Sequence, residues 1–377
     1  MNNSTIVNIF LRKIFKFILS FILLTALAGC SRYRVVDQIK MVDIMGFEQG
    51  NNSADSKLYG GVIIHEYSMG KEEDVLTSIM SYGKSATQTL SQINQKSPNL
   101  LEIGKTQVIV LGADFAKEQG IYEVVHSICR NAKIGANLKI VISEEPLSVF
   151  FKKLTELDGN FLPHLLEQNM IHNILPESNM QTFLYNFYGI GRDAYIPYST
   201  ITREGDIVVK KLGVIDQNSK LKLLLEEEEA TLIKLIQDQS KEIFFPVPIE
   251  RDGKEGSITL KSLRGKSNLK SNHHDIVLLR LKLDTIILDY PEWIKLPDDY
   301  AFLEKEIKNF FKKRYQELFK KFQDNHVDPL GIGDIYRSKN KNWNEKDFYN
   351  KRYPNLKLES TIKIDILQSG VGEDTYE

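Results

Sequence analysis

The chain has 377 residues, 42% of them hydrophobic and 26% charged, an ordinary globular composition that excludes a disordered or collagen-like protein. Its 49 basic and 50 acidic side chains give a formal net charge of −1, so charge provides no argument for a nucleic-acid partner. Two cysteines exclude a disulfide-rich scaffold and a zinc site built from four thiolates.

The first thirty residues have the layout of an export signal. Arg12, Lys13 and Lys16 form a basic segment, and an uncharged run from Phe17 to Ala28 follows them. A helix of that length rises about 18 Å, which is too short for a hydrocarbon core of about 30 Å. A signal peptide over residues 1–29 is therefore predicted in preference to a permanent membrane helix.

The uncharged run ends in Leu27-Ala28-Gly29-Cys30, which resembles the lipobox of bacterial lipoproteins. In that class the cysteine thiol takes a diacylglyceryl group and a peptidase cuts before the cysteine. Cys30 is therefore the predicted lipidation site. Two acyl chains, at about 0.8 kcal/mol per buried CH2, are enough for stable anchoring on a membrane. Cys129 would then be the only free thiol of the mature chain.

Residues 30–157 alternate between strand and helix patterns and are predicted to form an N-terminal α/β domain. The stretch from Glu72 to Asn94 places apolar residues mostly three and four apart, which predicts one amphipathic helix. A second helix is predicted from Asp114 to Arg130, with Gly120 as a possible break. Strands are predicted at Val42–Phe47, Val62–Tyr67, Thr106–Leu111 and Leu138–Ser143, and a third helix from Pro146.

Residues 158–192 are less regular and are interpreted as a helical connector. Residues 193–292 are predicted to form a β-rich middle domain, a small sheet with one helix on it. The acidic run from Glu226 to Glu229 favours a helix start, because carboxylates stabilise the N-terminal end of a helix. The strands are expected at Tyr195–Thr202, Ile207–Ile215, Lys220–Leu225, Gly256–Leu263 and Asp275–Ile287.

Residues 293–377 are predicted to form a C-terminal domain with a long helix, Asp299 to Asn325, and a closing strand, Lys357 to Leu367. One face of this helix is basic, which is compatible with contact to anionic lipid heads or to an acidic partner. A solvated face fits better, because three glutamates share the helix. The basic side chains are Lys312, Lys313, Arg314, Lys320 and Lys321. The predicted fold class is mixed α/β (α+β), with three dissimilar domains of mixed sheets and packed helices.

Three Gly-Lys-Ser/Thr triplets begin at Gly83, Gly104 and Gly265. A phosphate-binding loop needs another glycine five residues earlier, so that backbone amides can surround the phosphates, and none of the three has it. The first triplet also falls inside the helix predicted above. Nucleotide binding is therefore not predicted.

Candidate metal and nucleophile sites are equally weak. His273 and His274 are adjacent at a strand start and point in opposite directions, so they cannot easily bind one ion. Cys129 has His126 on the same helical face, as a cysteine nucleophile would require, but we interpret it as a core residue. The Gly331–Gly333 segment is interpreted as a tight turn that needs glycine. No catalytic, cofactor-binding or metal residue is predicted, no cofactor is expected, and the chain is not expected to be an enzyme.

Several stretches, in the same order along the chain, resemble the Ger(x)C family, the lipoprotein C subunits of spore nutrient-germinant receptors. The segment from Gly104 to Gly112 is similar to the family's Gly-His-x-x-x-Val-Ile-Leu-Gly strand, with Lys105 at the position of the His. Val327–Gly333 is similar to its Asp-x-x-Gly-x-Gly turn. The other similar stretches are Cys30, Val42–Phe47, Ile196-Pro-Tyr, Gly213-Val-Ile, Leu225–Ala230, Trp343, Tyr353-Pro354 and Ile362–Gly370.

The resemblance implies a three-domain lipoprotein without enzymatic activity. It implies partners, namely A- and B-type integral membrane subunits of a germinant receptor, and membrane lipid through the acyl anchor. It places the protein on the extracytoplasmic face of the inner spore membrane, where the complex triggers germination. It does not say which nutrient is sensed, or whether this subunit itself binds a small molecule.

Two other functions remain open at this point. A lipid-anchored solute-binding protein of a transporter would have two similar lobes, whereas this chain shows three dissimilar predicted units. An extracellular hydrolase acting on the cell wall would need a carboxylate pair or a metal site, which the sequence does not display.

Overall fold

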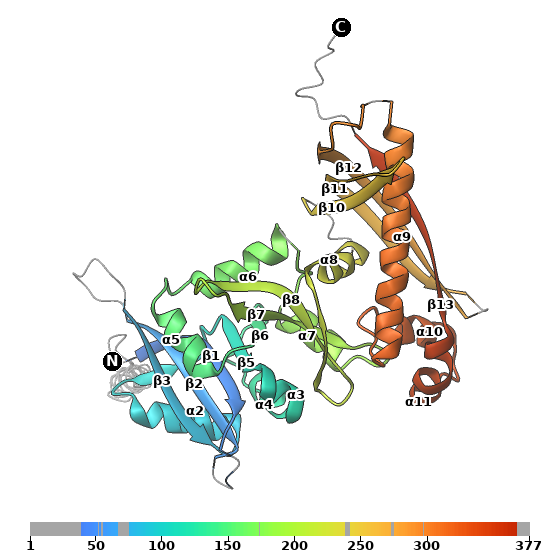
Figure 1. Cartoon of the computed structure of the whole chain (residues 1–377). Coiled ribbons are helices and arrows are strands. Elements are labelled where there is room, and N and C mark those ends of the chain that lie inside the picture. Colours follow the sequence, from blue (N-terminus) through green and yellow to red (C-terminus); the bar gives the residue numbers. More distant parts are fainter. Residues whose placement is uncertain are drawn as a thin grey trace, which may run out of the picture. The chain divides into compact units, whose positions relative to one another are not determined.

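The computed structural model describes residues 39–51, 53, 56–66, 75–172, 174–237, 242–272, 275–296 and 298–367 (Figure 1). The predicted signal peptide and lipidation site, Cys30, lie outside the described residues, as do His273 and His274. The chain from Lys40 onward forms one compact unit, and the description below concerns that unit together with Ile39, where its first strand starts.

The larger of the two described sheets is mixed, with the strand order β3-β2-β1-β5-β6-β7-β8-β9 and with β4 paired to β1. Strands β1, β5, β6 and β7 run parallel to one another, and the strands at both sides of this group join it antiparallel. The strands are β1 (Ile39–Gln49), β2 (Leu58–Glu66), β3 (Val75–Gly83), β4 (Leu100–Glu102), β5 (Val108–Gly112), β6 (Lys139–Ser143), β7 (Ala194–Ile201), β8 (Ile207–Ile215) and β9 (Leu221–Leu225).

Helices cover both faces of this sheet. Every residue of β5 is buried, as expected for a parallel strand with a layer on each side. Because successive strand side chains point to opposite faces, Val108 belongs to one hydrophobic cluster and Ile109 to the other. The first cluster includes helices α5 (Leu147–Thr155) and α6 (Phe161–Ile171), and the second includes α2 (Ala86–Lys96), α3 (Ala113–Glu118), α4 (Tyr122–Cys129) and α7 (Met180–Phe187).

The segment from Glu72 to Asn94 is not the single helix that its apolar spacing predicted. Val75–Gly83 forms strand β3, and helix α2 begins only at Ala86. β3 pairs with β2 over its whole length, and these long-range hydrogen bonds outweigh the local spacing. Ser85 then caps α2, because its side chain accepts a hydrogen bond from the Gln88 N–H.

The smaller described sheet has the order β10-β11-β12-β13, antiparallel except for the β12–β13 pair. In β10 only alternate residues are buried, so Pro246 and Pro248 lie on the exposed side of an edge strand, where proline is tolerated. Helix α9 (Tyr300–Asp324) packs on this sheet (Figure 1) and buries its apolar stripe in the same cluster as the inner residues of β10. The strands are β10 (Phe244–Arg251), β11 (Lys254–Ser271), β12 (Ile276–Asp289) and β13 (Lys357–Ile366).

The strand pairing does not follow the boundaries at 192 and 292 expected from the sequence. Strands β7 to β9, from the predicted middle domain, complete the larger sheet, and β10 to β12 pair with β13 near the end of the chain. Strand partners are chosen by contacts far along the chain, which a local pattern does not report. The division into residues 30–157, 158–192, 193–292 and 293–377 as separate units stays a prediction.

Most other predicted elements are confirmed. Helix α9 lies within one residue of the prediction at each end. The predicted helix over residues 114–130 is broken at Gly120, whose φ of 84° is a backbone conformation that favours glycine. Helix α8 (Glu227–Ile236) begins in the acidic run, with Glu226 as its N-cap. After α9 come α10 (Ile332–Lys339), α11 (Glu345–Asp347), a π-helical turn (Phe348–Arg352) and a 3-10 turn (Tyr353–Asn355).

Candidate functional site

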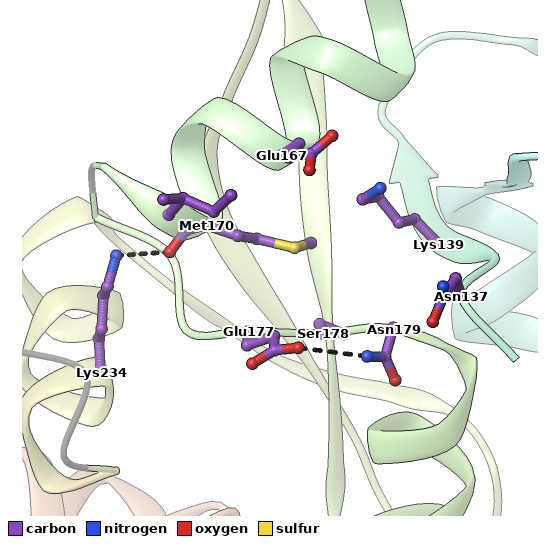
Figure 2. Close-up of a pocket in the computed structure, with 9 residues that line it drawn as sticks. Asn137, Lys139, Glu167, Met170, Glu177, Ser178, Asn179 and Lys234 are labelled. Carbon is purple, nitrogen blue, oxygen red and sulfur yellow. Dashed lines mark hydrogen bonds between the residues drawn. The ribbon is translucent and has the colours of Figure 1, made fainter.

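A cavity of about 400 Å³ opens between α6, the start of β6 and the segment that leads into α7 (Figure 2). Its volume is within the range of small-molecule sites, which are about 300–1,000 Å³. The residues that line it are Asn137, Lys139, Glu167, Met170, Ile171, Glu177, Ser178, Asn179 and Lys234. We refer to this site as the α6 cavity.

Charged side chains of both signs face the α6 cavity. Glu167 and Lys139 point toward the same space from different elements, and Glu177 lies across from Glu167 (Figure 2). Glu177 accepts a hydrogen bond of 3.3 Å from the Asn179 side-chain amide. Within the described part of the chain, neither Glu167 nor Lys139 has an ion-pair partner within 4.0 Å. These two charges are therefore available to a ligand.

Lys234 reaches the α6 cavity from helix α8 and is only 1% exposed. Its ammonium donates a hydrogen bond of 2.7 Å to the carbonyl of Met170, in the last turn of α6. Cations are favoured there because the last carbonyls of a helix lack partners within the helix. Burial lowers the pKa of Lys234 to about 8. Lys234 therefore positions the end of α6, and its sequence signal was a lysine within the apolar run Leu232 to Ile236.

A second site connects the segment that enters β7 of the larger sheet with the segment that follows α9, the helix on the smaller sheet. It contains the turn at Gly331–Gly333. We refer to it as the inter-sheet contact: residues 191–193, just before β7, against residues 328–334, just after α9. The Asp334 N–H donates to the Gly191 carbonyl at 2.8 Å. A Cβ on Gly333 would lie 2.9 Å from the Cα of Gly191, so the two chain segments approach closely only because glycine is present.

The predicted turn at Gly331–Gly333 is therefore part of a packed contact. Gly331 has a φ of 68° and is the N-cap of α10, which agrees with the interpretation that the backbone needs glycine. Beside it, Arg192 forms an ion pair with Asp334. Asp334 also pairs with Arg337 at 2.6 Å.

Two carboxyl groups are buried together in the inter-sheet contact. Asp193 is 4% exposed and Asp328 is 0% exposed. Asp328 accepts hydrogen bonds from the Ile332 N–H at 2.9 Å, the Gly333 N–H at 2.7 Å and the Tyr349 hydroxyl at 2.9 Å. The Asp328 N–H donates to a carboxyl oxygen of Asp193 at 2.6 Å, and the Asp193 N–H donates back to the Asp328 carbonyl at 3.0 Å.

The two carboxyl groups differ in their ionisation. Burial raises the pKa of Asp193 to about 8. Burial also raises the pKa of Asp328, but only to about 6, because its three hydrogen-bond donors stabilise the charged form. The hydrogen bonds to Asp328 therefore favour the proton on Asp193 and the negative charge on Asp328. All acceptor atoms of Asp328 are used inside the protein, which makes the contact structural.

The other candidates from the sequence lie apart from both sites. Cys129 donates a hydrogen bond to the Met180 sulfur at 3.6 Å, and burial raises its pKa, which disfavours the nucleophilic thiolate. His126 instead stacks on Tyr122, with 5.4 Å between the ring centroids. The triplet at Gly83 lies at the junction of β3 and α2, not inside a helix as predicted.

The basic face of α9 is largely neutralised by neighbouring carboxylates. Arg314 pairs with Glu228 at 2.8 Å, and Lys321 pairs with Glu229 at 2.7 Å. Further along the helix, Lys320 pairs with Asp324 at 2.6 Å. This arrangement fits the predicted solvated face better than a dedicated anion-binding surface.

The described residues contain no group of three or more His, Cys, Asp or Glu side chains that could hold a metal ion. Among the helices in that same part of the chain, none combines the length and the apolar composition needed to cross a membrane.

Two family models match consecutive parts of the chain. The model described as Spore germination protein N-terminal domain matches residues 32–201, and the one described as Spore germination B3/GerAC like, C-terminal, matches residues 210–370. The chain belongs to the Ger(x)C family of spore germination proteins. The first match ends with β7 and the second begins within β8, so the boundary between them falls inside the larger sheet.

Individual relatives of the family span nearly the whole chain. Spore germination protein GerQC of Bacillus cereus is 25% identical over 368 residues, covering 95% of this chain and 99% of that protein. Spore germination protein KC of Bacillus subtilis (strain 168) is 21% identical over 400 residues, covering 96% and 97%. The crystal structure of the GerBC protein has a TM-score of 0.56 at 15% identity, covering 86% of this chain and 97% of that one. That similarity supports the fold.

Proposed function

We propose that this germination protein is the lipid-anchored C subunit of a nutrient germinant receptor, held by Cys30 on the extracytoplasmic face of the inner spore membrane. The observation that carries the proposal is the position of the lipobox, at residues 27–30, directly before the family match that begins at residue 32. A lipid anchor directly before the first matched domain suits a protein that works at a membrane surface.

We also propose that the protein acts through contacts with A- and B-type integral membrane subunits, without catalysis. The family resemblance supports this role. Co-isolation from spore membranes tests the role directly, and we expect two polytopic membrane proteins to accompany the full chain.

The anchor is tested by Cys30→Ala at the native locus, with membrane association and nutrient germination of the spores as readouts. We expect the membrane-bound fraction to fall by more than about ten-fold, because the acyl chains supply the anchoring free energy, and germination to be lost with it. The matched control is Cys129→Ala, since Cys129 packs against Met180 in the folded protein. It should preserve both readouts.

Each outcome of the Cys30→Ala experiment has a distinct meaning. A released protein with normal germination would show that the anchor is not required for the function. Unchanged membrane association would contradict lipid anchoring and would point to partner contacts or to an uncleaved N-terminal helix.

A further inference from the structure

Two side chains of opposite charge, Glu167 and Lys139, face the α6 cavity without forming an ion pair. Glu167 is exposed and Lys139 is half-buried, and neither has an ion-pair partner in the part of the chain that the structure describes. By contrast, the surface charges of α9 are mostly paired. Glu167 and Lys139 are therefore not held by an ion pair within the described part of the chain.

The arrangement of charges limits the kind of ligand. An anion would meet Lys139 but would be repelled by two carboxylates, Glu167 and Glu177. A simple cation would meet those carboxylates but would be repelled by Lys139. A molecule that carries an ammonium and a carboxylate a few bonds apart can satisfy both sides at once.

The uncharged residues of the α6 cavity supply the remaining contacts. The side-chain amides of Asn137 and Asn179 and the hydroxyl of Ser178 can donate to a ligand carboxylate. Met170 is 6% exposed, and its thioether lies at the centre of the view in Figure 2, where it offers an apolar surface. Ile171, at 55% exposure, extends this apolar surface toward solvent.

We propose that the α6 cavity binds a small zwitterion of the amino-acid class. The ligand ammonium pairs with Glu167 and Glu177, its carboxylate pairs with Lys139, and an aliphatic side chain contacts Met170. Lys234 acts as a positioning residue, because its hydrogen bond to the Met170 carbonyl fixes the end of α6. This site is independent of the anchor and the partners proposed above, so it can fail or succeed separately from them.

The test is ligand-observed NMR by saturation transfer, on the purified full chain with a mixture of the twenty proteinogenic L-amino acids. The amino acid with the strongest signal is then titrated beside two analogues, the amine without its carboxylate and the acid without its ammonium. We expect each analogue to bind about ten-fold more weakly, which corresponds to the loss of one ion pair of about 1.4 kcal/mol.

Matched variants locate the binding. Lys139→Met and Glu167→Gln should each weaken the amino acid about ten-fold. Lys105→Met and Glu123→Gln, which change exposed residues outside the α6 cavity, should leave it unchanged. Because the four positions are exposed or half-buried, thermal melting of the variants should match the parent protein.

Three results would overturn the proposal. The first is a mixture in which no amino acid gives a signal. The second is equal binding of the amino acid and its two analogues, since this would mean that the charges of the α6 cavity are not used. The third is an unchanged affinity in both cavity variants, which would place the binding elsewhere on the chain.

Discussion

The α6 cavity and the inter-sheet contact both gather charged side chains from distant parts of the chain, but they use them in opposite ways. In the inter-sheet contact, Asp328 is fully buried and its carboxylate accepts from three donors of the protein. In the α6 cavity, Glu167 and Lys139 face a hollow and have no such partners among the described residues. Satisfied charges hold a fold together, whereas charges left open toward a cavity are available for recognition.

The largest expected effect tests the structural side of this comparison. Asp328→Asn replaces one acceptor oxygen by an NH2 group. In one orientation this group faces the Ile332 N–H, and in the other it faces both the Gly333 N–H and the Tyr349 hydroxyl. We expect the free energy of unfolding to fall by about 3 kcal/mol, because a buried charged acceptor is lost and donors remain unpaired. Urea unfolding at pH 7 measures this change.

The control for this variant is Asp347→Asn. Asp347 is 64% exposed and pairs with Lys351 on the surface, so its loss should cost less than about 0.5 kcal/mol. Similar costs for Asp328→Asn and Asp347→Asn would contradict the distinction drawn between the buried contact and the surface.

The next prediction concerns how the free energy of unfolding depends on pH, and it distinguishes the two buried carboxyl groups. With its pKa raised to about 8, Asp193 keeps a proton in the folded protein that the unfolded chain releases near pH 4. Its contribution therefore makes the protein less stable as pH rises from about 4 to about 8. Asp193→Asn mimics the neutral form, so it should be close to the parent near pH 4 and exceed it by a margin that grows with pH, to at least on the order of 2 kcal/mol at pH 8.5.

Thermal melting of Asp193→Asn and the parent between pH 4 and pH 9 measures this difference. An Asp193→Asn variant that is less stable than the parent at every pH would show that Asp193 is the charged member of the pair.

The smallest expected effect concerns Lys234, for which the pH dependence has the opposite sign. Its pKa is lowered to about 8, so the folded protein releases a proton that the unfolded chain keeps up to about pH 10. The parent should gain stability from this residue as pH rises from about 8 to about 10. Lys234→Met removes the buried charge and should raise stability by about 1 kcal/mol at pH 7, less so at pH 10.

Chemical unfolding at pH 7 and pH 10 checks this expectation for Lys234→Met. The hydrogen bond to the Met170 carbonyl opposes the gain, because Met cannot donate it. Loss of more than about 2 kcal/mol at pH 7 would mean that this hydrogen bond outweighs the burial of the charge.

The elements that the sequence predicted well are those whose signals are local. Helix α9 has an apolar stripe with a helical period, and its ends match the prediction within one residue. The break between α3 and α4 followed from Gly120, and the start of α8 followed from the acidic run at Glu226. The lipobox and the family resemblance also needed only the order of residues along the chain.

Only the tertiary structure decided the strand partners and both sites. Residues 75–83 have a helical spacing but form β3, because β2 supplies hydrogen bonds along the whole strand. Asp193 and Asp328 meet across 135 residues, and the α6 cavity draws Lys139, Glu167 and Lys234 from three separate elements. Caps and helical periods act over three or four residues, whereas pairing and burial depend on which distant segments pack together.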